Sequence, residues 1–152
     1  MPLYEDSFIS VSTTLLEETK ALRSFIEILK KEEQVLIEGK FEEIDFYSSE
    51  KFRLIEILTQ FNDHRENYLK AQGIDLDKNC MNNWLSKQNS DQIRIIEIWN
   101  ELLDLAGIAK KLNQSNGLII AARYQHHQRA LAAIHSAAGN VSCYGSKGQP
   151  CI

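Results

Sequence analysis

The residues that could bind a metal ion are three histidines near the C-terminus, but their spacing does not suit a metal site. His126, His127 and His135 fall within one expected helix. Adjacent residues on a helix point about 100° apart, and His135 lies more than two turns further along. Zinc sites instead bring their ligands together at characteristic short spacings. We therefore expect no metal at this cluster.

Paired glutamates are the other residues that could take part in chemistry, and we expect them to be solvated. Glu17-Glu18, Glu32-Glu33 and Glu42-Glu43 each fall within or beside an expected helix. Nothing in their spacing pairs two carboxylates for acid–base catalysis. The sequence also lacks a glycine-rich phosphate loop, a nucleophile elbow and an HExxH motif. It predicts a protein that is not an enzyme and needs no cofactor.

The composition is that of a foldable helical chain. Its 152 residues fit one domain, or one domain with a tail, and 43% of them are hydrophobic. The two prolines, Pro2 and Pro150, stand near the ends and leave long helices uninterrupted. No run of about 18 apolar residues and no apolar leader occur, so we expect a cytoplasmic protein without a membrane span. The odd number of cysteines suits reduced thiols: Cys80, Cys143 and Cys151.

Charge is distributed unevenly along the chain. Residues 1–104 contain 12 Lys/Arg and 21 Asp/Glu, a net charge of −9, whereas residues 105–152 contain five Lys/Arg and no acid. The basic part could attract an acidic partner surface. Five positive charges over this length are too sparse for a nucleic-acid footprint, so we expect no nucleic-acid partner.

Apolar periodicity predicts two long helices in the first half. Residues 5–38 form the first, since leucines recur every seven positions as in a coiled-coil seam. Residues 41–72 form the second, between turns at Gly39 and Gly73. Lys51 and Arg65 fall on or beside its apolar face, where we expect their stems to snorkel and their charges to lie at its edge. The leucines of the first seam are Leu15, Leu22, Leu29 and Leu36.

The second half predicts one longer helix over residues 91–138, after an irregular stretch at 73–90. Within that stretch, residues 80–85 could form a short helix that places Trp84 in the core. Residues 139–152 have the Gly, Ser and Asn content of a flexible tail. The expected apolar stripe of the long helix is Ile96, Trp99, Leu103, Ala106, Asn113, Ile120, Tyr124, Leu131 and Ile134.

Unequal helix lengths are the main structural prediction. Helices of about 33 residues extend about 50 Å, and one of about 48 residues extends about 70 Å. We therefore expect an elongated antiparallel three-helix bundle or coiled coil, with the long C-terminal helix projecting beyond it by about 25 Å. An apolar stripe left in water usually marks a binding surface. A second molecule should cover it, either another copy or a client helix.

The polar step Asn113-x-x-Asn116-Gly117 interrupts the long apolar stripe. Asn at a seam position often fixes helix register, and Gly within a helix costs about 1 kcal/mol relative to Ala. Two interpretations remain open. The step is either an accidental weak point or break between two helices, or a polar landmark and hinge for a partner.

These residues resemble a known family. The Asn-x-x-Asn-Gly step, Gln128, Ala130-Leu131 and the element Tyr144-Gly145-x-x-Gly148-Gln149 are similar in order and spacing to the C-terminal signature of FlgN-type flagellar export chaperones. Glu50-Lys51 and Arg65 also resemble that family's pattern. One departure is Ser146-Lys147, where the family often has an acidic residue.

The resemblance implies a cytoplasmic chaperone for the hook–filament junction proteins FlgK and FlgL. Such a chaperone would hold their C-terminal segments and bring them to the flagellar type III export gate, with its ATPase complex. Tyr144, with Gly145 beside it, would act toward the export apparatus. Carried over by position, the client face would be Asn113, Asn116, Gly117, Ile120, Tyr124 and Leu131, and the apolar stripe adds Ile134.

Other functions remain as alternatives. The projecting helix could close a homodimer, which would make the chain a structural or adaptor coiled-coil protein. A nucleic-acid-binding module is disfavoured because aromatic and basic residues are few in the C-terminal part. A metal-dependent enzyme built in the bundle core would need Glu-x-x-His pairs, which the sequence lacks.

Overall fold

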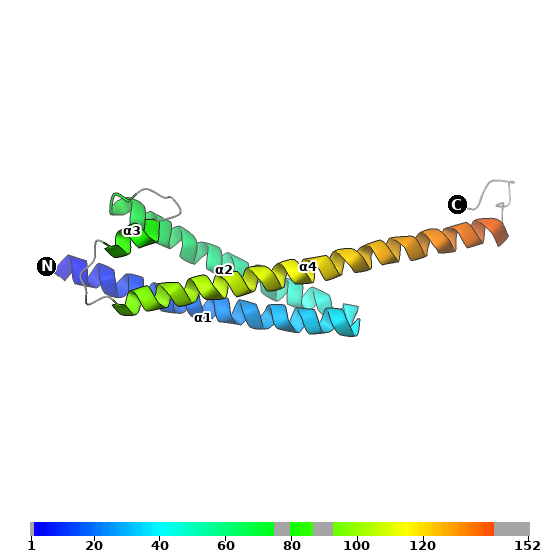
Figure 1. The fold of residues 1–152 in the computed structure, drawn as a ribbon, viewed down its shortest axis with the longest axis horizontal. Coiled ribbons are helices and arrows are strands. Elements are labelled where there is room, and N and C mark those ends of the chain that lie inside the picture. Colours follow the sequence, from blue (N-terminus) through cyan, green and yellow to red (C-terminus); the bar gives the residue numbers. More distant parts are fainter. Residues whose placement is uncertain (1, 75–79, 87–92, 142–152) are drawn as a thin grey trace. The chain divides into compact units, whose positions relative to one another are not determined.

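The computed structural model describes residues 2–74, 80–86 and 93–141, and every element in these ranges is helical. Helix α1 spans Pro2–Glu38, the 3-10 turn η1 spans Phe41–Glu43 and α2 spans Ile44–Ala71. The short α3 spans Cys80–Ser86, and α4 spans Ile93–Val141 (Figure 1). The predicted all-α bundle with a long C-terminal helix is confirmed. None of the described helices is long and apolar enough to cross a lipid bilayer.

The chain divides into two compact units, which are described separately. The first covers Met1–Asn113 and contains α1, η1, α2, α3 and α4 up to Asn113; the second covers Gln114–Ile152 and contains the rest of α4. We call these the bundle unit and the C-terminal unit.

Helix α1 contributes the predicted heptad seam to the bundle unit. All four leucines of the seam are buried, and three of them, Leu15, Leu22 and Leu29, share one core with apolar side chains of α2, α3 and the first part of α4. Representative partners are Leu54, Met81 and Ile98. Burying a leucine side chain stabilises the fold by about 1.5–3 kcal/mol, so this seam is a major source of stability.

Glycines in the left-handed conformation end α1 and α2, as the sequence predicted. Gly39 has a φ of 72° and Gly73 a φ of 76°. After α2, the backbone N–H of Gly73 donates to Lys70 O and that of Ile74 donates to Leu69 O, both at 3.0 Å. These are the two bonds of a Schellman motif. The side chains of Ile74 and Leu69 are both buried in the same apolar core.

The short helix α3 confirms the expected core position of Trp84. Trp84 is buried together with Met81 and Leu85. Its ring meets that of Tyr68 edge-to-face, with ring centroids 5.9 Å apart. Burial raises the pKa of the Tyr68 hydroxyl above its ordinary value of 10.0, and a hydrogen bond with Trp84 partly opposes this.

The predicted phase of the α4 stripe is wrong by one residue. Ile96, Leu103 and Asn113 of the expected stripe are exposed, and Trp99 is half-buried. Up to Leu112, the α4 residues that pack against the core follow an alternating three–four spacing, with Trp99 as an addition to it, and every one of them is apolar. A coiled-coil seam prefers such an unbroken apolar series to one containing Asn113. The residues of this series are Ile95, Ile98, Leu102, Leu105, Ala109 and Leu112, and Trp99 of the predicted stripe also packs against the core.

Helix boundaries differ modestly from those predicted. Helix α1 begins at Pro2 rather than residue 5, and residues 41–43 form η1 ahead of α2. Helix α4 passes through Asn116 and Gly117 without a break and ends at Val141, three residues beyond the predicted 138. The interpretation of this step as a break between two helices is therefore wrong. The predicted helix positions 91–92 and most of the predicted tail, residues 142–152, lie outside the described residues.

Candidate functional site

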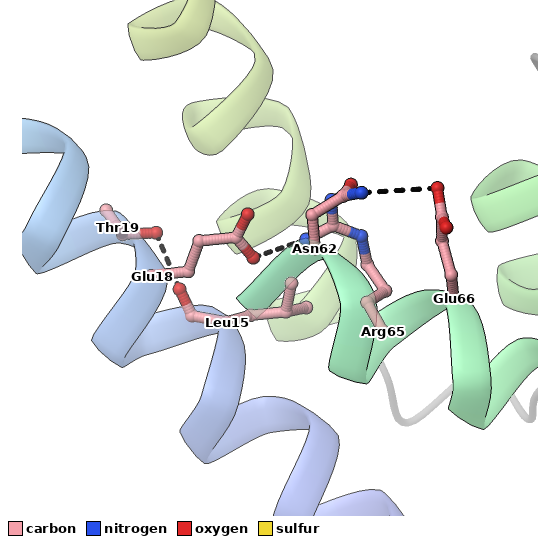
Figure 2. Close-up of polar contacts among 6 residues, drawn as sticks. All are labelled: Leu15, Glu18, Thr19, Asn62, Arg65 and Glu66. Carbon is pink, nitrogen blue, oxygen red and sulfur yellow. Dashed lines mark hydrogen bonds and ion pairs between the residues drawn. The ribbon is translucent and has the colours of Figure 1, made fainter. Parts of the chain in front are cut away.

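A charged cluster joins the three long helices of the bundle unit at Arg65. The Arg65 guanidinium on α2 forms an ion pair with Glu18 on α1, and both side chains are largely buried (Figure 2). It also donates to Asn62 Oδ1 at 2.8 Å. Its central carbon lies 5.1 Å from the ring centroid of Trp99 on α4, within the range of a cation–π contact.

A second cluster joins the same three helices at Lys51. The ammonium group of Lys51 lies 3.2 Å from Glu32 Oε1 on α1 and donates to Asn113 Oδ1 on α4 at 2.9 Å. The Glu32 side chain is only 1% exposed and that of Lys51 is 18% exposed. The prediction that the glutamate pairs are solvated is confirmed for Glu17, Glu42 and Glu43, which are exposed. It was wrong for Glu18 and Glu32, which are buried and form ion pairs with Arg65 and Lys51.

The two clusters are one pattern repeated after 14 residues. Glu18 and Glu32 are 14 residues apart on α1, Lys51 and Arg65 on α2, and the α4 residues Trp99 and Asn113 likewise. This is two heptads, or about 21 Å along a helix. The numbering rises along α1 and α4 and falls along α2, as the antiparallel topology requires. We call the two clusters the polar layers.

The polar layers specify register more than they add stability. A buried ion pair roughly offsets its own desolvation cost, but a misplaced buried charge is strongly unfavourable. A slip of α2 by seven residues would set Lys51 against Phe25, which lies in the apolar core between the layers. The reverse order of the pairs, Glu18–Arg65 and Glu32–Lys51, is the signal in the sequence that could have revealed them.

The C-terminal unit carries a different feature, a row of large exposed apolar side chains. Ile120, Tyr124, Leu131 and Ile134 are between 42% and 64% exposed. At about 100° per residue they fall within an arc of about 80° on α4. We call these four residues the C-terminal stripe. Leu118, which is 72% exposed, points about 160° away from Ile120.

The structure places the remaining predicted site residues in three different settings. Asn113 accepts the hydrogen bond from Lys51, and Asn116 is fully buried. Asn116 continues the three–four spacing of the core-facing α4 residues. Gly117 has open space around it, since an added Cβ would meet no atom within 4 Å. Tyr144 and Gly145 lie outside the described residues.

The C-terminal stripe is a candidate surface for binding another helix. Among the described side chains, no cluster of three His, Cys, Asp or Glu residues could hold a metal ion. The Tyr124 hydroxyl accepts a hydrogen bond from Gln128 Nε2 at 2.9 Å, the i to i+4 contact of a helix surface. A long helix with an exposed apolar arc is suited to pairing with another helix.

The sequence was compared with known protein families, curated proteins and solved structures. A family model described as FlgN protein matches residues 1–151 of the chain. The chain is a member of the FlgN family. FlgN-family proteins are flagellar export chaperones, and the chain is assigned that general role. The family is not known for enzymatic activity. No curated protein and no solved structure matches the chain.

Proposed function

We propose that this FlgN-family protein binds the C-terminal helical segments of the hook–filament junction proteins FlgK and FlgL through the C-terminal stripe. The observation that supports this is the exposure of four large apolar side chains on one arc of α4. Exposed apolar patches on soluble proteins usually mark interaction sites. An amphipathic client helix would cover the arc by the helix-in-groove mode of recognition.

Covering the client segment would prevent premature assembly. The apolar face of the client would be occupied by the chaperone in the cytoplasm and therefore closed to other copies of the client. Release requires a moderate affinity, because the complex must come apart at the export gate. A helix of a few apolar anchors supplies such an affinity, since each buried side chain contributes about 1.5–3 kcal/mol before the entropic cost of binding.

The Asn113-x-x-Asn116-Gly117 step would mark where the client-binding part of α4 begins. Asn113 accepts a hydrogen bond from Lys51 of the second polar layer, and the Asn116 side chain is buried. Gly117 has no side chain and no close neighbour, and would let a client backbone approach α4. In this proposal the two asparagines fix the helix and Gly117 contacts the client.

Delivery to the export gate is assigned to Tyr144 and Gly145 by resemblance to the family. Both follow the described part of the chain. Ser146-Lys147 stands where the family often has an acidic residue, so docking would rely on the tyrosine and the backbone rather than on a negative charge. Replacing Tyr144 with Ala should leave client binding unchanged and weaken binding to gate components.

Aspartate substitutions in the stripe test client binding. Leu131→Asp and Ile134→Asp each place a charge where an apolar contact is proposed, and should weaken binding of FlgK or FlgL C-terminal segments by about 10-fold to 100-fold. Titration calorimetry measures the affinity, and circular dichroism checks that the helices remain. Leu118→Asp is the matched control, because Leu118 is equally apolar and lies on the opposite side of α4. Unchanged affinity in both stripe variants would remove this site.

The alternative is a homodimeric coiled-coil adaptor in which two stripes cover each other. The same exposed arc supports it. Light scattering on the purified protein distinguishes the two, because an obligate dimer persists on dilution to low concentration whereas a client-binding chaperone leaves the stripe available.

A further inference from the structure

On α4 itself, the residues that flank the C-terminal stripe are basic or neutral. After Asp104 the chain contains no Asp or Glu, while α4 carries Arg123, Arg129 and three histidines. We measure angles around the α4 axis from Ile120. His127 then falls inside the arc of the stripe, and Arg123 and His135 lie about 60° from Ile120 on opposite sides. On α4 the apolar arc is thus bordered by Arg123 on one edge and by His135 on the other.

We infer that the occupant of the stripe is an amphipathic helix with acidic residues along both edges of its apolar face and a hydrogen-bond acceptor opposite His127. This inference rests on the proposed function and adds the chemistry by which the client is chosen. Complementary charges at the rim of an interface speed association and suppress wrong partners. Carboxylates on the client would meet Arg123 on one edge and His135 on the other.

The same distribution of charge argues against a second copy of the stripe as the occupant. A two-fold contact places the same surface patch on both sides. Two α4 segments paired through their stripes would place the Arg123 side chains of both copies at one interface, and residues 105–141 of both copies contain no acidic side chain. Like charges placed across an interface oppose association.

Two designed peptides test the inference on the full chain. Both carry the same leucine and isoleucine face on a helix, and one has glutamates along its edges where the other has lysines. Fluorescence anisotropy should show the glutamate peptide binding at least about tenfold more tightly at low salt. The difference should shrink at high salt, because exposed charges are screened.

Charge-reversal variants locate the effect. Arg123→Glu combined with His135→Glu should reverse the preference toward the lysine peptide. Arg129→Glu is the matched control, because Arg129 points about 180° away from Ile120 and should change the preference much less. An equal affinity for both peptides, or a preference that persists in the double variant, overturns the inference.

The outcomes also separate this inference from the proposed function. Equal binding of both peptides that is lost in Leu131→Asp would leave the stripe as the client site and remove only the acidic preference. Failure of both peptides to bind, or binding that survives Leu131→Asp, would remove the stripe itself and the inference with it. A tight dimer that excludes both peptides would overturn the inference in favour of self-association.

Discussion

Replacing Lys51 with Ala should destabilise the bundle unit far more than removing a typical surface lysine. The substitution leaves the Glu32 carboxylate, 1% exposed, without its cation, and takes the donor from Asn113. Breaking one side of a buried pair costs about 3–5 kcal/mol. Lys51 is 18% exposed, so some water can reach the vacated space, and we expect a loss of about 2–4 kcal/mol in the free energy of unfolding. This corresponds to a melting temperature lower by about 5–15 °C.

Urea denaturation followed by circular dichroism measures this loss. Arg53→Ala is the matched control on the same helix, because Arg53 pairs with Glu50 at the surface and should contribute less than about 1 kcal/mol. A double variant, Glu32→Leu with Lys51→Leu, should recover most of the stability, because it removes both charges together. If Lys51→Ala behaves like Arg53→Ala, the pair is effectively solvated and the argument for the polar layers fails.

Two further predictions concern Gly117 and Tyr68. Gly117→Ala should stabilise α4 by about 1 kcal/mol, because the site has room for a methyl group and Ala favours helix. If calorimetry also shows a lower client affinity, Gly117 contacts the partner. If the client affinity is unchanged, Gly117 is an incidental weak point of the helix. Because burial raises the pKa of Tyr68, the folded state favours the neutral phenol. Its contribution to stability is complete below pH 10 and should decline as the pH rises further, whereas Tyr68→Phe should remove that part of the decline in urea denaturation.

Patterns confined to one helix were predictable from the sequence. The leucine seam of α1, the turns at Gly39 and Gly73, and the core position of Trp84 each depend on local periodicity or on one residue type. The face of α4 that packs against the core could not be predicted from the sequence of this helix alone. Two candidate stripes one residue apart are both largely apolar, and only packing against α1 and α2 distinguishes them.

The polar layers depend on contacts between helices, which the pattern of a single helix does not reveal. Glu32 looks like a surface residue until Lys51, 19 residues further along the chain, is recognised as its partner. Burial of such a pair depends on two helices at once, and the signal is the matched spacing of opposite charges in reverse order. The exposed residues of the C-terminal stripe were predictable, but the client cannot be read from its apolar residues alone because any amphipathic helix could cover them.

The repeat of the polar layers has a consequence for how such chains can change in length. An insertion or deletion confined to one helix between the two layers would separate the ion pair of one layer while the other layer stayed paired. Matched changes of two heptads in α1, α2 and the first part of α4 would instead add or remove a complete layer. Relatives with the same arrangement of layers should therefore differ in length by two heptads in each of the three helices at once.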